Sequence, residues 1–167
     1  MKVILYMAIS ADGFIARNNG DSDWVSENDS GFTEIMTKNG NVVVGRKTFD
    51  QYYRDIFPVE GVTNFVLSAG AGYKDDNVVV LPSPDSIVEE AENRGIDNLV
   101  VVGGGKVNQS FLESNLIDEI QLVVHPLILS NGMKLFGVSD KTLDLEFIKS
   151  LDLGVDGLVR LYYKIKK

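Results

Sequence analysis

Two turns that contain glycine are the parts of this sequence best suited to hold an anionic ligand. The first follows an apolar run and reads Gly45-Arg46-Lys47-Thr48 before a predicted helix. Glycine permits close approach of a backbone, and the first turn of a helix offers N–H groups and a favourable dipole to a phosphate. Arg46 and Lys47 add local positive charge that suits a phosphate ester. A solvated basic pair at a helix end is the alternative interpretation.

The second turn joins another apolar run to a predicted helix and consists of Gly103, Gly104, Gly105, Lys106 and Val107. Three consecutive glycines are costly in chain entropy, so a tight turn or a close approach by a ligand explains them best. A pyrophosphate fits such a turn. It is no Rossmann fingerprint, because Asn108 stands at the third glycine position, and no P-loop, because Val107 stands where Ser or Thr would bind magnesium. A purely structural turn is the alternative.

Asp29 is the residue best placed for acid–base chemistry. It follows Trp24 by five residues at the start of a predicted amphipathic helix. A partly buried carboxylate there could accept hydrogen bonds from the N–H groups of a heterocycle and relay a proton. The segment Ser26-Glu27-Asn28-Asp29 also fits a capping box, in which Asp29 would only accept the N–H of Ser26. The sequence leaves both roles open.

Aromatic residues near these segments are candidates to bind a flat substrate. Trp24 could stack on the substrate or cover the edge of the core. Phe32, Phe49 and Tyr52 are candidates to line the same cleft, although aromatic residues on a helix face belong more often to the core. The single histidine, His125, has no partner at metal-ligand spacing, so no metal site is predicted.

The elements that must position these residues alternate between apolar runs and amphipathic stretches. Strands are predicted at 3–9, 41–45, 62–67, 77–81, 98–102 and 117–125, and helices at 27–38, 48–54, 84–94 and 106–114. Several strands are apolar throughout, which is typical of the middle of a sheet covered by helices. Two final runs, 143–151 and 158–165, flank a glycine-containing turn and predict a closing hairpin. The pattern predicts an α/β fold with a mixed, mostly parallel central sheet that ends in a C-terminal antiparallel hairpin.

Composition limits the class of protein. A chain of 167 residues fits one domain over 1–167, and no stretch approaches the roughly 20 apolar residues of a membrane span. The absence of cysteine excludes disulfides, zinc ribbons and thiol nucleophiles, and we expect a cytoplasmic protein. The net charge of −8 argues against nonspecific binding to nucleic acid or to an anionic membrane. An anionic ligand must therefore meet a local basic site.

Three segments, 45–49, 66–68 and 102–107, resemble in order and spacing the cofactor segments of dihydrofolate reductase. The resemblance implies the three-layer α/β/α fold of that superfamily and NADPH as cofactor. It places the 2′-phosphate near Arg46, Lys47 and Ser68, the pyrophosphate near Thr48 and the triple-glycine turn, and the nicotinamide beside Ala8 and Ile15. The cofactor-binding residues so implied are Ala8, Ile15, Gly45, Arg46, Lys47, Thr48, Leu67, Ser68, Gly103, Gly104, Gly105, Lys106 and Val107. Asp29 falls on the carboxylate that holds and helps to protonate the pterin.

Two further segments, 10–16 and 125–136, resemble the reductase domain of riboflavin biosynthesis, the RibD C-terminal domain, and its stand-alone homologues. This resemblance implies hydride transfer from NADPH to a C=N or C=O group of a pyrimidine-, pterin- or ribosylamine-like substrate, as in 5-amino-6-(5-phosphoribosylamino)uracil reductase. It also implies a homodimer. One departure is Phe14, where many of these reductases carry Lys. The alternatives are dihydrofolate reductase activity and a nucleotide-binding protein without catalysis.

Overall fold

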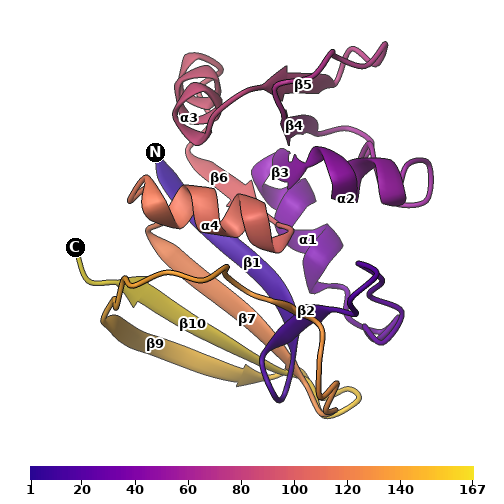
Figure 1. The fold of residues 1–167 in the computed structure, drawn as a ribbon, viewed down its shortest axis with the longest axis vertical. Coiled ribbons are helices and arrows are strands. Elements are labelled where there is room, and N and C mark those ends of the chain that lie inside the picture. Colours follow the sequence, from indigo (N-terminus) through magenta and orange to yellow (C-terminus); the bar gives the residue numbers. More distant parts are fainter.

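An eight-stranded sheet forms the middle layer of the computed structural model, which describes residues 1–167 (Figure 1). The order of its strands is β5-β4-β3-β6-β1-β7-β10-β9. The strands from β5 to β7 in this order are parallel, whereas β10 runs antiparallel to β7 and β9 antiparallel to β10. Their bounds are β1 (Lys2–Ser10), β3 (Asn41–Gly45), β4 (Thr63–Leu67), β5 (Val78–Leu81), β6 (Asn98–Val101), β7 (Glu119–His125), β9 (Leu145–Asp152) and β10 (Val159–Ile165). The predicted mixed sheet with a C-terminal antiparallel hairpin is confirmed.

Helices cover both faces of this sheet, α3 (Pro84–Asn93) and α4 (Gly105–Glu113) on one and α1 (Gly31–Asn39) and α2 (Arg46–Gln51) on the other (Figure 1). The central strand β1 shows the consequence of alternating side chains. Its residues Val3, Leu5 and Met7 join the core beneath α3 and α4, and Ile4 and Tyr6 join the core beneath α1 and α2. The α/β/α layering therefore follows from strands that are apolar on both faces.

The helix predicted over 84–94 is present as α3, which begins at Pro84. Ser83 Oγ accepts the N–H of Ser86 at 3.1 Å, and Pro84 occupies the first turn. The start of α1 differs, because the predicted helix over 27–38 begins only at Gly31. The Ser26–Asp29 capping box does not form. The N–H of Asp29 donates to the carbonyl of Ser26 at 3.1 Å instead, which makes a turn before the helix.

A small second sheet, absent from the sequence prediction, pairs β2 (Phe14–Ala16) with β8 (Met133–Lys134). The carboxylate of Asp12 supports the pairing, since it accepts hydrogen bonds from Ser10 Oγ at 2.7 Å and from the N–H of Ser130 at 2.8 Å. This links the loop after β1 to the loop after β7. None of the helices is long and apolar enough to cross a bilayer.

Gly132 permits this pairing, and a side chain there should break it. A Cβ atom at Gly132 would overlap the carbonyl oxygen of Ala16, which belongs to the backbone and cannot rotate away. We expect Gly132→Ala to lower the free energy of unfolding by about 1–3 kcal/mol, the usual cost of forcing an extra methyl into a packed site. Thermal and urea denaturation measure this. Gly72→Ala is the control, because nothing lies within 4 Å of its Cβ position, and equal loss in both variants would contradict the prediction.

Candidate active site

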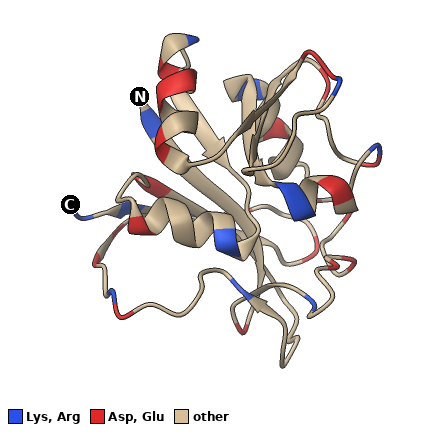
Figure 2. Ribbon diagram, turned by 45° about the horizontal axis from the view of Figure 1, so that its top comes forward, with Lys and Arg blue, Asp and Glu red and all other residues tan.

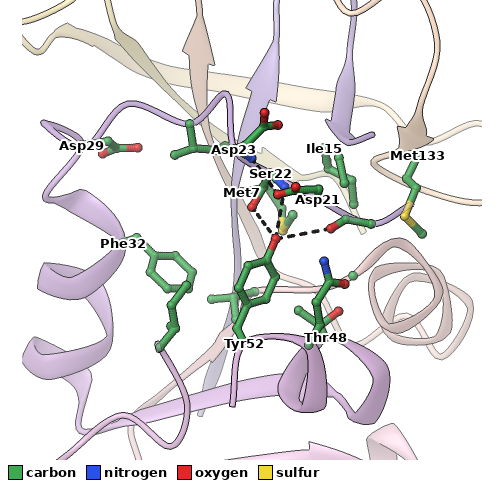
Figure 3. Close-up of a pocket in the computed structure, with 18 of the residues that line it drawn as sticks. Met7, Ile15, Asp21, Ser22, Asp23, Asp29, Phe32, Thr48, Tyr52 and Met133 are labelled. Carbon is green, nitrogen blue, oxygen red and sulfur yellow. Dashed lines mark hydrogen bonds between the residues drawn. The ribbon is translucent and has the colours of Figure 1, made fainter. Parts of the chain in front are cut away.

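A pocket of about 440 Å³ opens beside the carboxyl ends of β1, β3 and β6 (Figure 3). Its walls come from the end of β1, from β2, from the 20–29 loop, from α1 and from α2. This is the edge of a parallel sheet at which ligands are expected to bind.

The two glycine turns meet at one side of this pocket. The N–H of Gly45 donates to the carbonyl of Gly103 at 2.9 Å. A Cβ at Gly45 would lie 2.8 Å from Val107 Cγ2, and one at Gly105 would lie 2.8 Å from the carbonyl oxygen of Lys134. Close contact between chain segments thus requires these glycines. The same contact brings the first turn of α2 close to the first turn of α4. Each of these turns carries a basic residue (Figure 2). Each also has backbone N–H groups that find no acceptor within the helix.

Arg46 and Ser68, predicted from distant segments, are in contact. Arg46 Nε donates to Ser68 Oγ at 2.8 Å, and Nη2 donates to the carbonyl of Ala71. The guanidinium also stacks over the ring of Tyr73, 4.7 Å from its centroid. Burial and a hydrogen bond to Asp50 raise the pKa of Tyr73 to about 12, so this ring stays a neutral platform.

Asp29 lines the opposite end of the pocket. Its Oδ1 accepts the N–H of Gly31 at 3.1 Å, and Oδ2 has no partner in the protein. Tyr6 and Phe32 line the pocket beside it. Burial, followed by the nearby Asp29 carboxylate, raises the pKa of Tyr6 well above its usual value, so this hydroxyl remains protonated. One carboxylate oxygen is therefore free to accept a hydrogen bond from a ligand.

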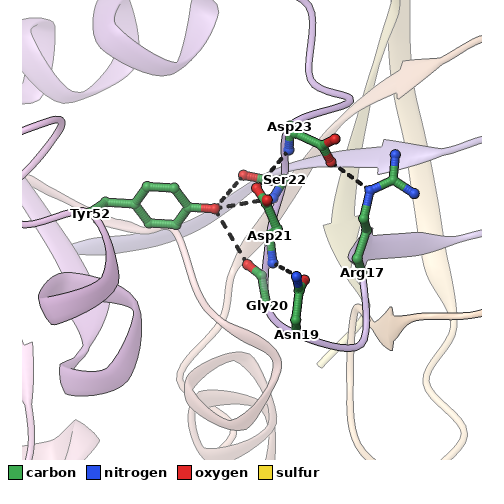
Figure 4. A network of polar contacts seen from close by, with 7 residues as sticks. All are labelled: Arg17, Asn19, Gly20, Asp21, Ser22, Asp23 and Tyr52. Atoms are coloured by element: carbon green, nitrogen blue, oxygen red, sulfur yellow. Dashed lines mark hydrogen bonds and ion pairs between the residues drawn. The ribbon is translucent and has the colours of Figure 1, made fainter.

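Tyr52 crosses between these two ends. In Figure 3, Asp29 and Phe32 lie on one side of its ring, and Thr48, Ile15 and Met133 lie on the other. Its hydroxyl group accepts the N–H of Ser22 at 3.1 Å and also contacts Ser22 Oγ at 2.9 Å and the Gly20 carbonyl at 3.4 Å (Figure 4). The loop that these contacts hold is closed further by the Arg17–Asp23 ion pair.

Residues 1–159 match the family described as the RibD C-terminal domain. The chain belongs to this family. The resemblance that the sequence segments indicated is confirmed, and so is the dihydrofolate reductase-like fold of the chain.

Three known proteins, two of them named dihydrofolate reductases, illustrate what this RibD C-terminal domain protein resembles. A protein from Shewanella sp. PV-4, named for riboflavin biosynthesis, has a TM-score of 0.85 and 30% identity with full coverage of both chains. Dihydrofolate reductase type 15 of Escherichia coli is 30% identical over 116 residues, which are 68% of this chain and 69% of that protein. Dihydrofolate reductase of Enterococcus faecalis, solved with NADP(H), has a TM-score of 0.78 and 20% identity over 99% of this chain and 97% of its own, a likeness of fold.

The predicted site residues divide into three groups. Those that line the pocket are Ala8, Ile15, Asp29, Phe32, Lys47, Thr48, Tyr52 and Gly104. Those that belong to the two glycine turns or to the end of β4 and do not line the pocket are Gly45, Arg46, Leu67, Ser68, Gly103, Gly105, Lys106 and Val107. Trp24 and Phe49 lie elsewhere and require correction.

Phe49 is fully buried, and its ring stacks on Phe57 at 5.6 Å, so it belongs to the core and not to the cleft. The ring of Trp24 packs edge-on against His125 at 5.3 Å and does not line the pocket. Trp24 therefore covers the edge of the core, which was the second of the two roles that the sequence left open. His125 is buried with Nδ1 against the carbonyl of Val123 at 3.1 Å, which agrees with a packing role.

Sequence reasoning missed several lining residues, among them Met7, Asp21, Ser22, Gln51 and Met133. Met133 lies in a segment that carried the family resemblance, so that segment was a usable signal. The loop residues Asp21 and Ser22 have no periodic pattern, and only the contact with Tyr52 brings them to the pocket.

Asp156 ties the pocket loop to the turn between β9 and β10. It accepts hydrogen bonds from Ser26 Oγ and from Asn28 Nδ2, the latter at 2.9 Å. These two bonds lower the pKa of Asp156 below its usual value of 3.8. A carboxylate with a depressed pKa in the folded state stabilises the fold above the unfolded pKa, and this contribution is lost as the pH falls through the folded pKa.

We therefore expect Asp156→Asn to lower the melting temperature at about pH 7 and to lower it less at about pH 3, where the stabilisation from this carboxylate begins to be lost. Asn tolerates the left-handed conformation of this residue, so the backbone is preserved. Thermal denaturation at both pH values measures the effect, with the exposed Asp76→Asn as control. An equal loss at both pH values would show that charge has no part in the contact.

Proposed function

We propose that this chain is an NADPH-dependent reductase that transfers hydride to a C=N or C=O group of a pyrimidine-, pterin- or ribosylamine-like ring. The observation that carries the proposal is a single pocket with two chemically different ends. One end has Thr48 and Gly104 beside two helix N-termini, and the other has the partly free carboxylate of Asp29. Membership of the RibD C-terminal domain family and the likeness to dihydrofolate reductases support it.

The residues at the first end fit a dinucleotide. The glycines of both turns lack the side chains that would bar a pyrophosphate, and the helix N-termini favour its negative charge. Arg46 and Ser68 would hold the 2′-phosphate, since they already form one hydrogen-bonded unit. Met7, Ile15 and Met133 supply an apolar wall for a flat ring. NADPH, when bound, supplies the hydride from C4 of its nicotinamide.

The residues at the second end would hold and orient the substrate. Asp29 Oδ2 would accept an N–H group of the ring, while the bond from Gly31 to Oδ1 fixes the carboxylate. The apolar wall and the loop held by Tyr52 would exclude water from the reacting atoms. Positioning of two rings in contact supplies most of the rate enhancement in such a reaction. Dihydrofolate is a second candidate substrate, supported by the 30% identity to a dihydrofolate reductase.

The role of Arg46 is tested by comparing the affinity of the protein for NADPH with its affinity for NADH. We expect Arg46→Ala to weaken NADPH binding by about 1–3 kcal/mol, because a charge-assisted bond to the 2′-phosphate is lost, and to leave NADH binding nearly unchanged. Calorimetric titration measures both affinities. Arg54→Ala is the control, since Arg54 is exposed and lies outside the pocket. Equal weakening of NADPH and NADH would remove Arg46 from the phosphate site.

The role of Asp29 is tested by replacing its charge without changing its shape. We expect Asp29→Asn to reduce kcat by about 10²- to 10⁴-fold, the usual contribution of a positioned acid–base group, with NADPH affinity unchanged. Turnover is followed as NADPH oxidation with a ribosylaminouracil and with dihydrofolate. Glu34→Gln is the control, because Glu34 is an exposed acid in the first turn of the same helix and does not line the pocket. Unchanged turnover in Asp29→Asn would leave this residue a purely structural role.

A further inference from the structure

The charges that line the pocket are strongly unbalanced. Four carboxylates, Asp21, Asp23, Glu27 and Asp29, line it against one cation, Lys47. Lys47 belongs to the first turn of α2, next to Thr48 at the end assigned to the cofactor. Negative charge therefore exceeds positive charge in the lining, and the one lining cation lies at the cofactor end.

Only one of the four carboxylates forms an ion pair. Asp23 Oδ1 lies 2.6 Å from Arg17 Nε in an ion pair. Asp21 accepts only the N–H of Asp23 at 3.1 Å, and Glu27 is exposed without an ion-pair partner. With Asp29 this leaves three carboxylates of the lining without an ion pair (Asp21 and Asp29 are labelled in Figure 3).

The cations nearest in the fold do not line this part of the pocket. Arg160 packs behind Tyr6, with Nη2 3.5 Å from its hydroxyl oxygen, and is close enough to Asp29 for the two charges to attract, but it does not line the pocket. Lys134 pairs across the small sheet with Phe14, and its exposed side chain also lies outside the lining. Arg46 is held by Ser68 and Ala71 at the cofactor end. No ammonium or guanidinium group thus lines the Asp29 end of the pocket.

We infer that the substrate of this pocket carries no phosphate and is a neutral or cationic ring that presents N–H donors to the carboxylates. The inference rests on the proposed reductase function and narrows its substrate class. Carboxylates accept hydrogen bonds from N–H donors, whereas a phosphate dianion among these carboxylates meets repulsion, and no lining cation at that end offsets it. Like charges placed in this way discriminate between ligands by excluding one of them.

A matched pair of ligands tests this directly: 5-amino-6-(ribosylamino)uracil and its 5′-phosphate, each titrated into the protein saturated with NADP⁺. Calorimetric titration measures the dissociation constant of each compound. We expect the compound without phosphate to bind at least about tenfold more tightly at low ionic strength. The ratio of the two dissociation constants should approach one as salt is added, because salt screens the repulsion.

Two double variants test whether the difference in affinity between the two compounds comes from the charges in the pocket. In Asp21→Asn/Glu27→Gln we expect the ratio of the two dissociation constants to fall by at least about threefold, because two repulsive charges are removed. Glu89→Gln/Glu92→Gln removes the same charge from exposed positions on α3, a helix with no residue in the pocket lining, and should leave the ratio unchanged.

Three results would overturn the inference while the reductase proposal stands. The phosphorylated compound binds equally well or better, the ratio is the same in both double variants, or neither compound binds although NADPH does. Failure of the protein to bind NADPH would refute the proposed function itself, and the inference with it.

Discussion

The contact between the two strand-to-helix turns is the constraint on which the rest of the site depends. One hydrogen bond from Gly45 to Gly103 sets the start of α2 against the start of α4. The glycine at each turn is required because the neighbouring turn or loop occupies the place of a side chain, as Val107 does at Gly45. The close approach that packing demands is therefore the same feature that leaves backbone donors of two helices beside one pocket. The structural and the ligand-binding interpretations of these glycines are compatible.

The register of α2 follows from this contact and decides which of its residues can meet a ligand. The helix starts at Arg46, directly after β3, and not at 48 as the sequence predicted. Thr48 and Tyr52, four residues apart, lie on one face of the turn and line the pocket, whereas Phe49 is rotated by about 100° and enters the core. An aromatic residue one position from a functional one can thus be purely structural.

Local patterns in the sequence were sufficient for most of the fold but not for the details of the site. The apolar strands, the capped start of α3 and the closing hairpin all depend on neighbouring residues, and they agree with the structure. The β2–β8 sheet depends on pairing between Phe14 and Lys134, which no local pattern encodes. The start of α1 was misplaced because Ser26 finds its partner in Asp156, 130 residues away. The homodimer and the preference for NADPH stay predictions.

Asp29 shows why the sequence left two roles open and why they need not compete. In the predicted capping box, the carboxylate of Asp29 would accept the N–H of Ser26. In the structure, Ser26 lies in a turn before the helix and its hydroxyl group donates to Asp156. The carboxylate instead caps Gly31 at the first helical position through Oδ1 alone. A carboxylate has acceptor sites on both oxygens, so one can orient the group while the other remains for a ligand. The capping bond thereby reduces the freedom of a group that must be held still if it is to position a substrate.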